Sequence, residues 1–196
     1  MLGAMTKHAD TRRGRIRATL QDAIDQTTCV RLTTRDGDDV VGYCVGVGRR
    51  WCLVALAAPW PDGYAAVRLA ALERIHRVEP ATVERRAFER DDRWPPAAPE
   101  DLDLDRTDAL LAGLADRFPL VGLDLRDSED DVFVGAPALV AEGTLMLQEL
   151  GSDAQWDALS AWRLRDITRV TVHDRYLQLL ADLAPPQPQQ PSPFSD

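Results

Sequence analysis

The spacing of apolar residues changes from a helical to a strand-like pattern early in the chain. Ile16, Leu20 and Ile24 lie four residues apart, which predicts one apolar stripe of an amphipathic helix. From Cys29 onward, β-branched and aliphatic residues come in short runs separated by polar turns, which is typical of strands. Gly42 interrupts the second run and predicts strong bending there. We therefore expect a helix followed by five short, bent strands in the first half.

The second half follows the same plan. Apolar residues at helical spacing over 110–118 predict another helix, and strand-like runs follow it. The likeness is clearest where VRLAALERIHRV, residues 67–78, recurs as WRLRDITRVTV, residues 162–172. The two copies lie 95 residues apart, since Arg68 recurs as Arg163. The sequence therefore predicts one structural unit that is used twice.

These patterns divide the chain into four segments, and the expected fold class is mainly β with flanking helices. We expect a first helix and small β-barrel over 12–90, an acidic, proline-rich linker over 91–106, a second helix and β-barrel with a C-terminal helix over 107–184, and a disordered tail over 185–196. A short helix is also expected over 82–90, and Asp174 is expected to cap the C-terminal helix. One continuous sheet through both halves would contradict this arrangement.

A short helix followed by five strongly bent strands, with a glycine in the second strand, resembles the Sm-like (LSm) family. The second motif of that family is Ile-Arg-Gly-x-x-Ile, and residues 67–72 and 162–167 are similar to it. Gly42 and Gly135 match the glycine of the first motif. The resemblance covers most of both halves and implies two tandem five-stranded barrels of the SH3-like type.

The residues that build the RNA-base pocket of that family are mostly different here. Counted from each glycine, the Asp and Asn of the first motif fall on non-matching residues, which are Gly48 and Cys52 in the first half and Ala141 and Leu145 in the second. Of the RNA-contacting residues, only Arg68 and Arg163 match. The resemblance therefore implies the fold and weakens the uridine-binding function.

The charge of the chain is unevenly distributed. The 196 residues carry a net charge of −9, with 45% hydrophobic residues. Residues 1–90 hold 15 Lys and Arg against 11 Asp and Glu, whereas residues 91–196 hold 8 against 21. This asymmetry predicts either a basic surface for an anionic partner or two halves that attract each other. No run of about 18 apolar residues is present. We therefore expect a cytoplasmic protein without membrane contact.

The residue types needed for catalysis or metal binding are scattered. Three cysteines lie in strand-like runs without CxxC spacing, and three histidines are widely separated, namely Cys29, Cys44, Cys52, His8, His76 and His173. We expect buried, reduced thiols, no metal, no cofactor and no enzymatic activity. Whether Cys44 lies opposite Cys52 depends on the register of the turn between them.

Two binding functions fit the remaining pattern. The favoured one is a non-catalytic scaffold that acts through protein–protein contacts or self-association, with Trp60 and Trp156 as anchors. The alternative is binding of RNA or another single-stranded nucleic acid through the basic first half. Candidate residues for that alternative are the turn pair Arg49 and Arg50, Trp51 for base stacking, and Arg68 and Arg163.

The arginines near the first helix distinguish the two functions. If the basic and the acidic half dock, arginines of the first half should be partly neutralised, among them Arg12, Arg13, Arg15, Arg17 and Arg49. If they do not, these arginines remain available to phosphates.

Overall fold

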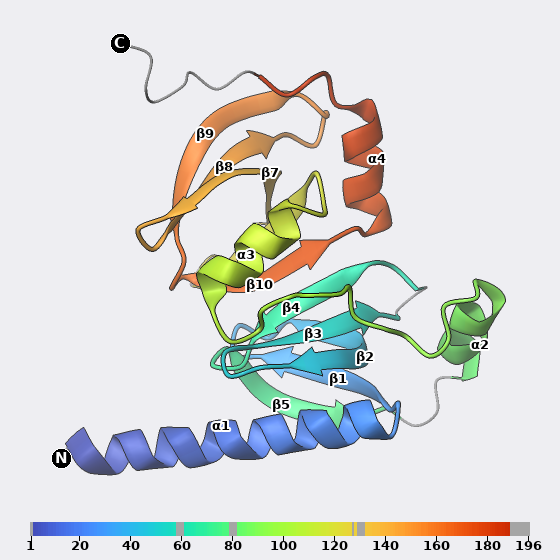
Figure 1. Ribbon diagram of the computed structural model, residues 1–196, viewed down its shortest axis with the longest axis vertical. Helices are drawn as coiled ribbons and strands as arrows, with labels where there is room; N and C mark the ends of the chain where they lie inside the picture. Colours follow the sequence, from blue (N-terminus) through green and yellow to red (C-terminus); the bar gives the residue numbers. More distant parts are fainter. Residues whose placement is uncertain (1, 58–60, 79–81, 127, 129–131, 189–196) are drawn as a thin grey trace.

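The protein folds around antiparallel strands. The computed structural model describes residues 2–57, 61–78, 82–126, 128 and 132–188. Over these residues, ten strands form one open sheet that four helices flank, so the fold is mainly β, as the sequence predicted (Figure 1).

The first half begins with a long helix. Its elements are α1 (Leu2–Asp25), β1 (Cys29–Thr34), β2 (Asp39–Val47), β3 (Trp51–Leu56), β4 (Tyr64–Arg68), β5 (Leu72–Arg77) and α2 (Thr82–Arg90). Leu20 is fully buried on α1, and Ile16 and Ile24 pack beside it against the sheet. The apolar stripe predicted from the sequence therefore faces the core.

The second half contains the remaining elements. They are α3 (Thr107–Ala115), β6 (Val121–Leu125), β7 (Val132–Ala141), β8 (Thr144–Leu150), β9 (Trp156–Arg163), β10 (Ile167–Val172) and α4 (Arg175–Leu183). The Asp174 side chain caps α4 as predicted, because its Oδ1 accepts a hydrogen bond of 2.7 Å from the Leu177 amide.

The sheet has the strand order β5-β1-β2-β3-β4-β10-β6-β7-β8-β9. Within each half, the fifth strand pairs with the first, and the first four strands pair with one another in sequence order. The halves meet where β4 pairs antiparallel with β10, with Arg169 opposite Val67 and Val172 opposite Tyr64. This junction places the two Arg-Leu segments side by side.

The expectation of two separate barrels without a common sheet is wrong. An unpaired β4 would leave a row of backbone N–H and C=O groups without partners, and β10 provides those partners. The pairing also buries Ala65, Ala66 and Val67. Pairing between such distant segments leaves no local sequence signal, so the apolar pattern of each half alone could not predict it.

The main core draws on both halves. Trp51 and Leu53 from β3 cluster with residues of the second half such as Leu110, Leu123 and Val170, and all five are almost completely buried. These side chains therefore stay buried only while the two halves are in contact.

The predicted linker is a packed segment. The carbonyl of Leu104 accepts hydrogen bonds from the amides of Arg50 and Trp51, at 3.3 and 3.0 Å. Leu102 and Leu104 also pack against the main core. The segment thus fixes the β2–β3 turn. Most of the predicted disordered tail, residues 189–196, lies outside the described residues.

Gly42 and Gly135 hold equivalent places in the second strand of each half. A Cβ on Gly42 would collide with the carbonyl oxygen of Ala55, and a Cβ on Gly135 would collide with that of Gln148. Both positions require glycine because a neighbouring backbone approaches closely.

Replacing Gly42 by Ala should therefore lower the free energy of unfolding by about 1–3 kcal/mol, since backbone must move to admit the methyl group. Urea unfolding followed by circular dichroism measures this. Gly14→Ala is the matched control, because no atom lies within 4 Å of a Cβ there and alanine favours the helix. A Gly42→Ala protein as stable as the Gly14→Ala protein would contradict the close approach.

Candidate functional site: an arginine-lined cleft

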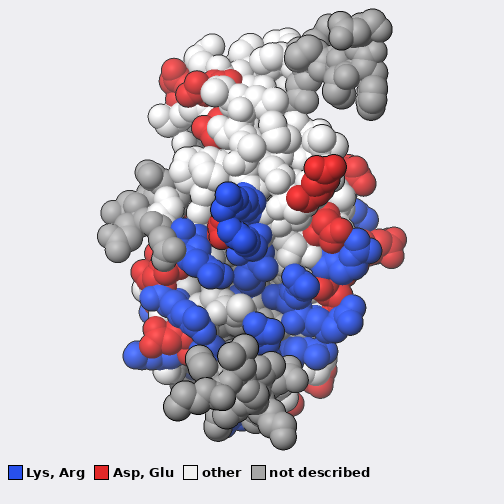
Figure 2. All heavy atoms as spheres, turned by 90° about the vertical axis from the view of Figure 1, so that its left-hand side faces the viewer, with Lys and Arg blue, Asp and Glu red and all other residues white. Residues whose placement is uncertain are grey.

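Two adjoining hollows lie on one face of the molecule. The first has a volume of about 700 Å³ and lies between the halves, and the second has about 680 Å³ and reaches α1. Both are lined by Arg50, Arg68 and Arg106, and we call them together the arginine cleft. Figure 2 shows Lys and Arg side chains gathered over the middle and lower part of this face.

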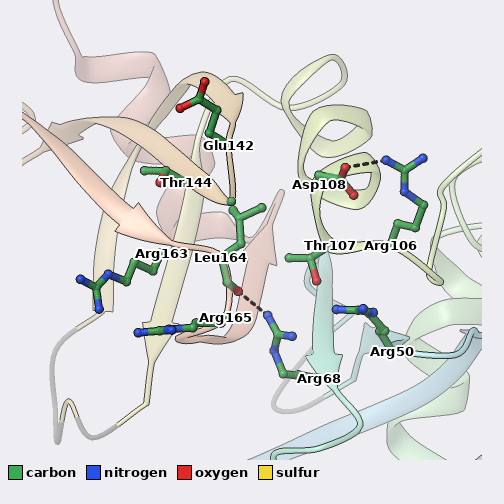
Figure 3. Close-up of a pocket in the computed structure, with 11 residues that line it drawn as sticks. Arg50, Arg68, Arg106, Thr107, Asp108, Glu142, Thr144, Arg163, Leu164 and Arg165 are labelled. Atoms are coloured by element: carbon green, nitrogen blue, oxygen red, sulfur yellow. Dashed lines mark hydrogen bonds and ion pairs between the residues drawn. The ribbon is translucent and has the colours of Figure 1, made fainter.

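Of the described residues, eight arginines and three carboxylates line the arginine cleft. The arginines are Arg13, Arg17, Arg49, Arg50, Arg68, Arg106, Arg163 and Arg165, and the carboxylates are Asp105, Asp108 and Glu142. In Figure 3, Arg163 and Arg165 lie on one side of the first hollow, Arg50 and Arg106 on the other, and Arg68 between them.

Each side of the arginine cleft is held by backbone contacts. Arg49 and Arg50 follow β2 in the turn that Leu104 fixes, and the Arg49 amide donates to Asp105 at 2.6 Å. On the other side, Arg163 ends β9, and the amide of Asp166 donates to the Arg163 carbonyl at 3.0 Å. The junction of β4 with β10 brings the two turns together.

Arg68 is a buried cation at this junction, with 8% of its surface exposed. Its Nε donates to the Ile167 carbonyl at 2.7 Å and its Nη2 to the Leu164 carbonyl, and its guanidinium lies 4.6 Å from the ring centre of Trp51. Burial, followed by the positive charges of Arg50 and Arg126, lowers the pKa of Arg68 to about 10.

No described carboxylate lies within ion-pair distance of Arg68. A buried cation whose charge is balanced only by carbonyl dipoles favours a nearby anion.

The other arginines of the cleft divide into two groups. Arg49 pairs with Asp105 at 2.8 Å, Arg106 with Asp108 at 2.6 Å, and Arg165 with Asp166 at 3.7 Å. Among the described residues, no such pair forms for a second group, which consists of Arg13, Arg17, Arg50 and Arg163. The cleft therefore keeps positive charge that the protein itself does not neutralise.

The aromatic candidates lie elsewhere. Trp51 is completely buried, and its Nε1 donates to the Thr107 hydroxyl at 3.1 Å, so the prediction that it stacks on a base is wrong for this conformation. Trp156 packs against α4, and its Nε1 donates to the Pro185 carbonyl at 2.7 Å. Trp60 lies outside the described residues.

Of the predicted binding residues, the structure brings together Arg49, Arg50, Arg68 and Arg163. Sequence reasoning missed Arg106 and Arg165. Arg106 was assigned to the linker, and Arg165 lies beside the matching Arg-Leu pair without a counterpart in the first half. Only the junction of the two halves makes them neighbours.

The remaining candidate chemistry is sparse. All three cysteines are buried and unpaired, and burial raises the pKa of Cys29 to about 11. Strands β2 and β3 place Cys44 opposite Val54, and Val47 opposite Cys52. In the described part of the chain, no group of three or more acidic, Cys or His residues is arranged to hold a metal ion.

Comparison of the chain with protein-family models, with curated proteins and with solved structures gives no match. Among the described helices, none is both long and apolar enough to cross a membrane.

The different burial of Arg68 and Arg163 leads to different expected effects on stability. Arg68→Met should lower the free energy of unfolding by about 1–3 kcal/mol, because the buried carbonyls of Leu164 and Ile167 lose their donors. Arg163→Met should change it by no more than about 0.5 kcal/mol, since Arg163 is exposed. Urea unfolding measures both, and equal effects would show that the two arginines have the same structural role.

Proposed function

We propose that the protein is a non-catalytic, single-stranded nucleic-acid-binding protein that uses the arginine cleft. We further propose that its two halves are Sm-like five-stranded units fused edge to edge. The shared strand order supports this fold assignment, as do the equivalent positions of Gly42 and Gly135 and of Arg68 and Arg163.

The observation that carries this proposal is the unpaired positive charge in the cleft. The halves do dock, and two ion pairs accompany that docking: Arg169 approaches Asp38 at 3.7 Å outside the cleft, and Arg49 pairs with Asp105 at 2.8 Å in the cleft. Of the arginines expected to be neutralised, Arg49 pairs with a carboxylate, whereas Arg13 and Arg17 remain exposed. The geometry thus favours the nucleic-acid alternative over the protein scaffold that the sequence favoured.

The lining of the cleft indicates how the strand would be contacted. Among the residues that the structure describes, no aromatic side chain lines either hollow, so these residues offer no base stacking there. Guanidinium groups on both walls suit successive phosphates, which are the same in every sequence. A hollow of about 700 Å³ takes a single strand more readily than a duplex. We therefore expect binding with little sequence preference and a strong dependence on salt.

Reversing charge in the cleft should weaken this binding. The double variant Arg17→Glu, Arg50→Glu should lose at least about tenfold in affinity for a fluorescent oligouridylate, measured by anisotropy at low salt, because two phosphate contacts become repulsive. Arg86→Glu, on the exposed face of α2, is the matched control and should bind like the wild type. Equal affinity of all three proteins, or no binding by the wild type, would rule out the proposed function.

The carboxylate of Asp108 should act in the opposite direction. It lies in the first hollow and pairs with Arg106, so it competes with phosphate for that arginine. Asp108→Asn should strengthen binding of the same oligouridylate by about two- to fivefold, since one negative charge is removed. Asp182→Asn, on exposed α4, provides the control. Weaker binding by Asp108→Asn would show that phosphate does not use Arg106.

A further inference from the structure

Helix α4 presents apolar side chains on two sides. Leu177 and Leu180 are almost completely buried in a cluster with strands of the second half. Tyr176, Leu179 and Leu183 are spaced three and four residues apart, so they form a second stripe along the helix, which we call the outer stripe. These three side chains are 49, 54 and 63% exposed. A contiguous apolar stripe on the outer side of a helix is suited to contact with another helix.

The described part of the chain leaves the outer stripe uncovered. After α4 the chain turns to the inner side of the helix, where the Pro185 carbonyl accepts a hydrogen bond of 2.7 Å from Nε1 of Trp156. Trp156 packs in the same cluster as the buried leucines of α4. In Figure 1, α4 lies at the right-hand side of the second half, whereas the arginine cleft lies on the left-hand face that Figure 2 shows. A partner bound to α4 would therefore leave the cleft free.

The two ends of α4 carry opposite charges beside the outer stripe. Arg175 is the first residue of the helix and Asp182 the residue before its last, and both are exposed. Within the described residues, neither forms an ion pair. They are seven residues apart, which is almost two full turns, so both lie on one flank of the outer stripe. The helix thus has a positive and a negative end along the same line.

The arrangement of these residues is symmetric about Leu179, the middle residue of α4. In an antiparallel pair with Leu179 opposite Leu179, Tyr176 of one copy lies level with Leu183 of the other, to within about 1.5 Å along the axis. Likewise, Arg175 of each copy lies level with Asp182 of the other. A two-fold axis keeps both charged flanks on the same side, so two ion pairs form. A parallel pair would instead bring like charges together.

We propose that two copies of this chain associate through an antiparallel pair of α4 helices, with a two-fold axis at Leu179. The contact joins the same surface of both copies, so association stops at a dimer. Three partly exposed apolar side chains provide less than the roughly 800 Å² that each partner buries in a standard interface, so the dimer is weak. The exposed ion pairs add little affinity and fix the orientation. This inference does not depend on nucleic-acid binding and is tested without nucleic acid.

Self-association is measured in the free protein by sedimentation velocity, over a concentration series from about 1 μM to about 1 mM. Leu179→Glu should raise the dissociation constant at least about tenfold, because two carboxylates would meet at the two-fold axis. Leu159→Glu is the matched control, since Leu159 is 45% exposed and lies on β9, and it should associate like the wild type. A wild type that stays monomeric, or equal association of Leu179→Glu and the wild type, would overturn the proposal.

The antiparallel orientation is tested by crosslinking. A Tyr176→Cys chain mixed with a Leu183→Cys chain should give a disulfide-linked dimer on mild oxidation with diamide, since all native cysteines are buried. Each chain alone is the control and should give far less dimer, because an antiparallel pair holds the two copies of one position at opposite ends. No dimer in the mixture, or as much dimer from each chain alone, would overturn the pairing. If circular dichroism shows that Leu179→Glu does not fold, this experiment decides.

Discussion

The pairing of β4 with β10 is the constraint on which the rest of the structure depends. It converts two five-stranded halves into one sheet and buries the inner strands on both faces. It also buries the Arg68 guanidinium at a site where it contacts two backbone carbonyls and the Trp51 ring. The desolvation of a charged group is costly, and the two hydrogen bonds across the junction offset part of that cost. The same pairing brings the β2–β3 and β9–β10 turns together, so the cleft is a product of the junction and belongs to neither half alone.

The ion pairs explain how an acidic chain retains a basic face. Where the halves touch, Asp38 of the first half approaches Arg169, and Asp105 pairs with Arg49 at the rim of the cleft. Most of the remaining acidic residues of the second half do not line the cleft, so they cannot screen its arginines at close range. Net charge therefore says little about this surface. The distribution of charge over the folded sheet decides which partner the surface attracts.

The sequence predicted the local elements far better than their assembly. The spacing of apolar residues and the residue types predicted the helix over 82–90, the cap at Asp174 and the strand-like runs. Those features depend on residues that are close in sequence. The pairing of β4 with β10 and the burial of Trp51 depend on contacts across more than 50 residues, which leave no periodic trace. For the same reason Arg50 could be selected singly as a turn residue, and Arg68 and Arg163 by their match to a short motif, whereas their convergence with Arg106 required the fold.

The packed segment between the halves has a consequence for how the junction forms. Residues 91–106 tether β4 and β10 within one chain, and Leu104 fixes the tether against the β2–β3 turn. Each half therefore meets its partner at the high effective concentration of an intramolecular reaction, however dilute the protein is. Formation of the junction within the single chain is thereby independent of expression level.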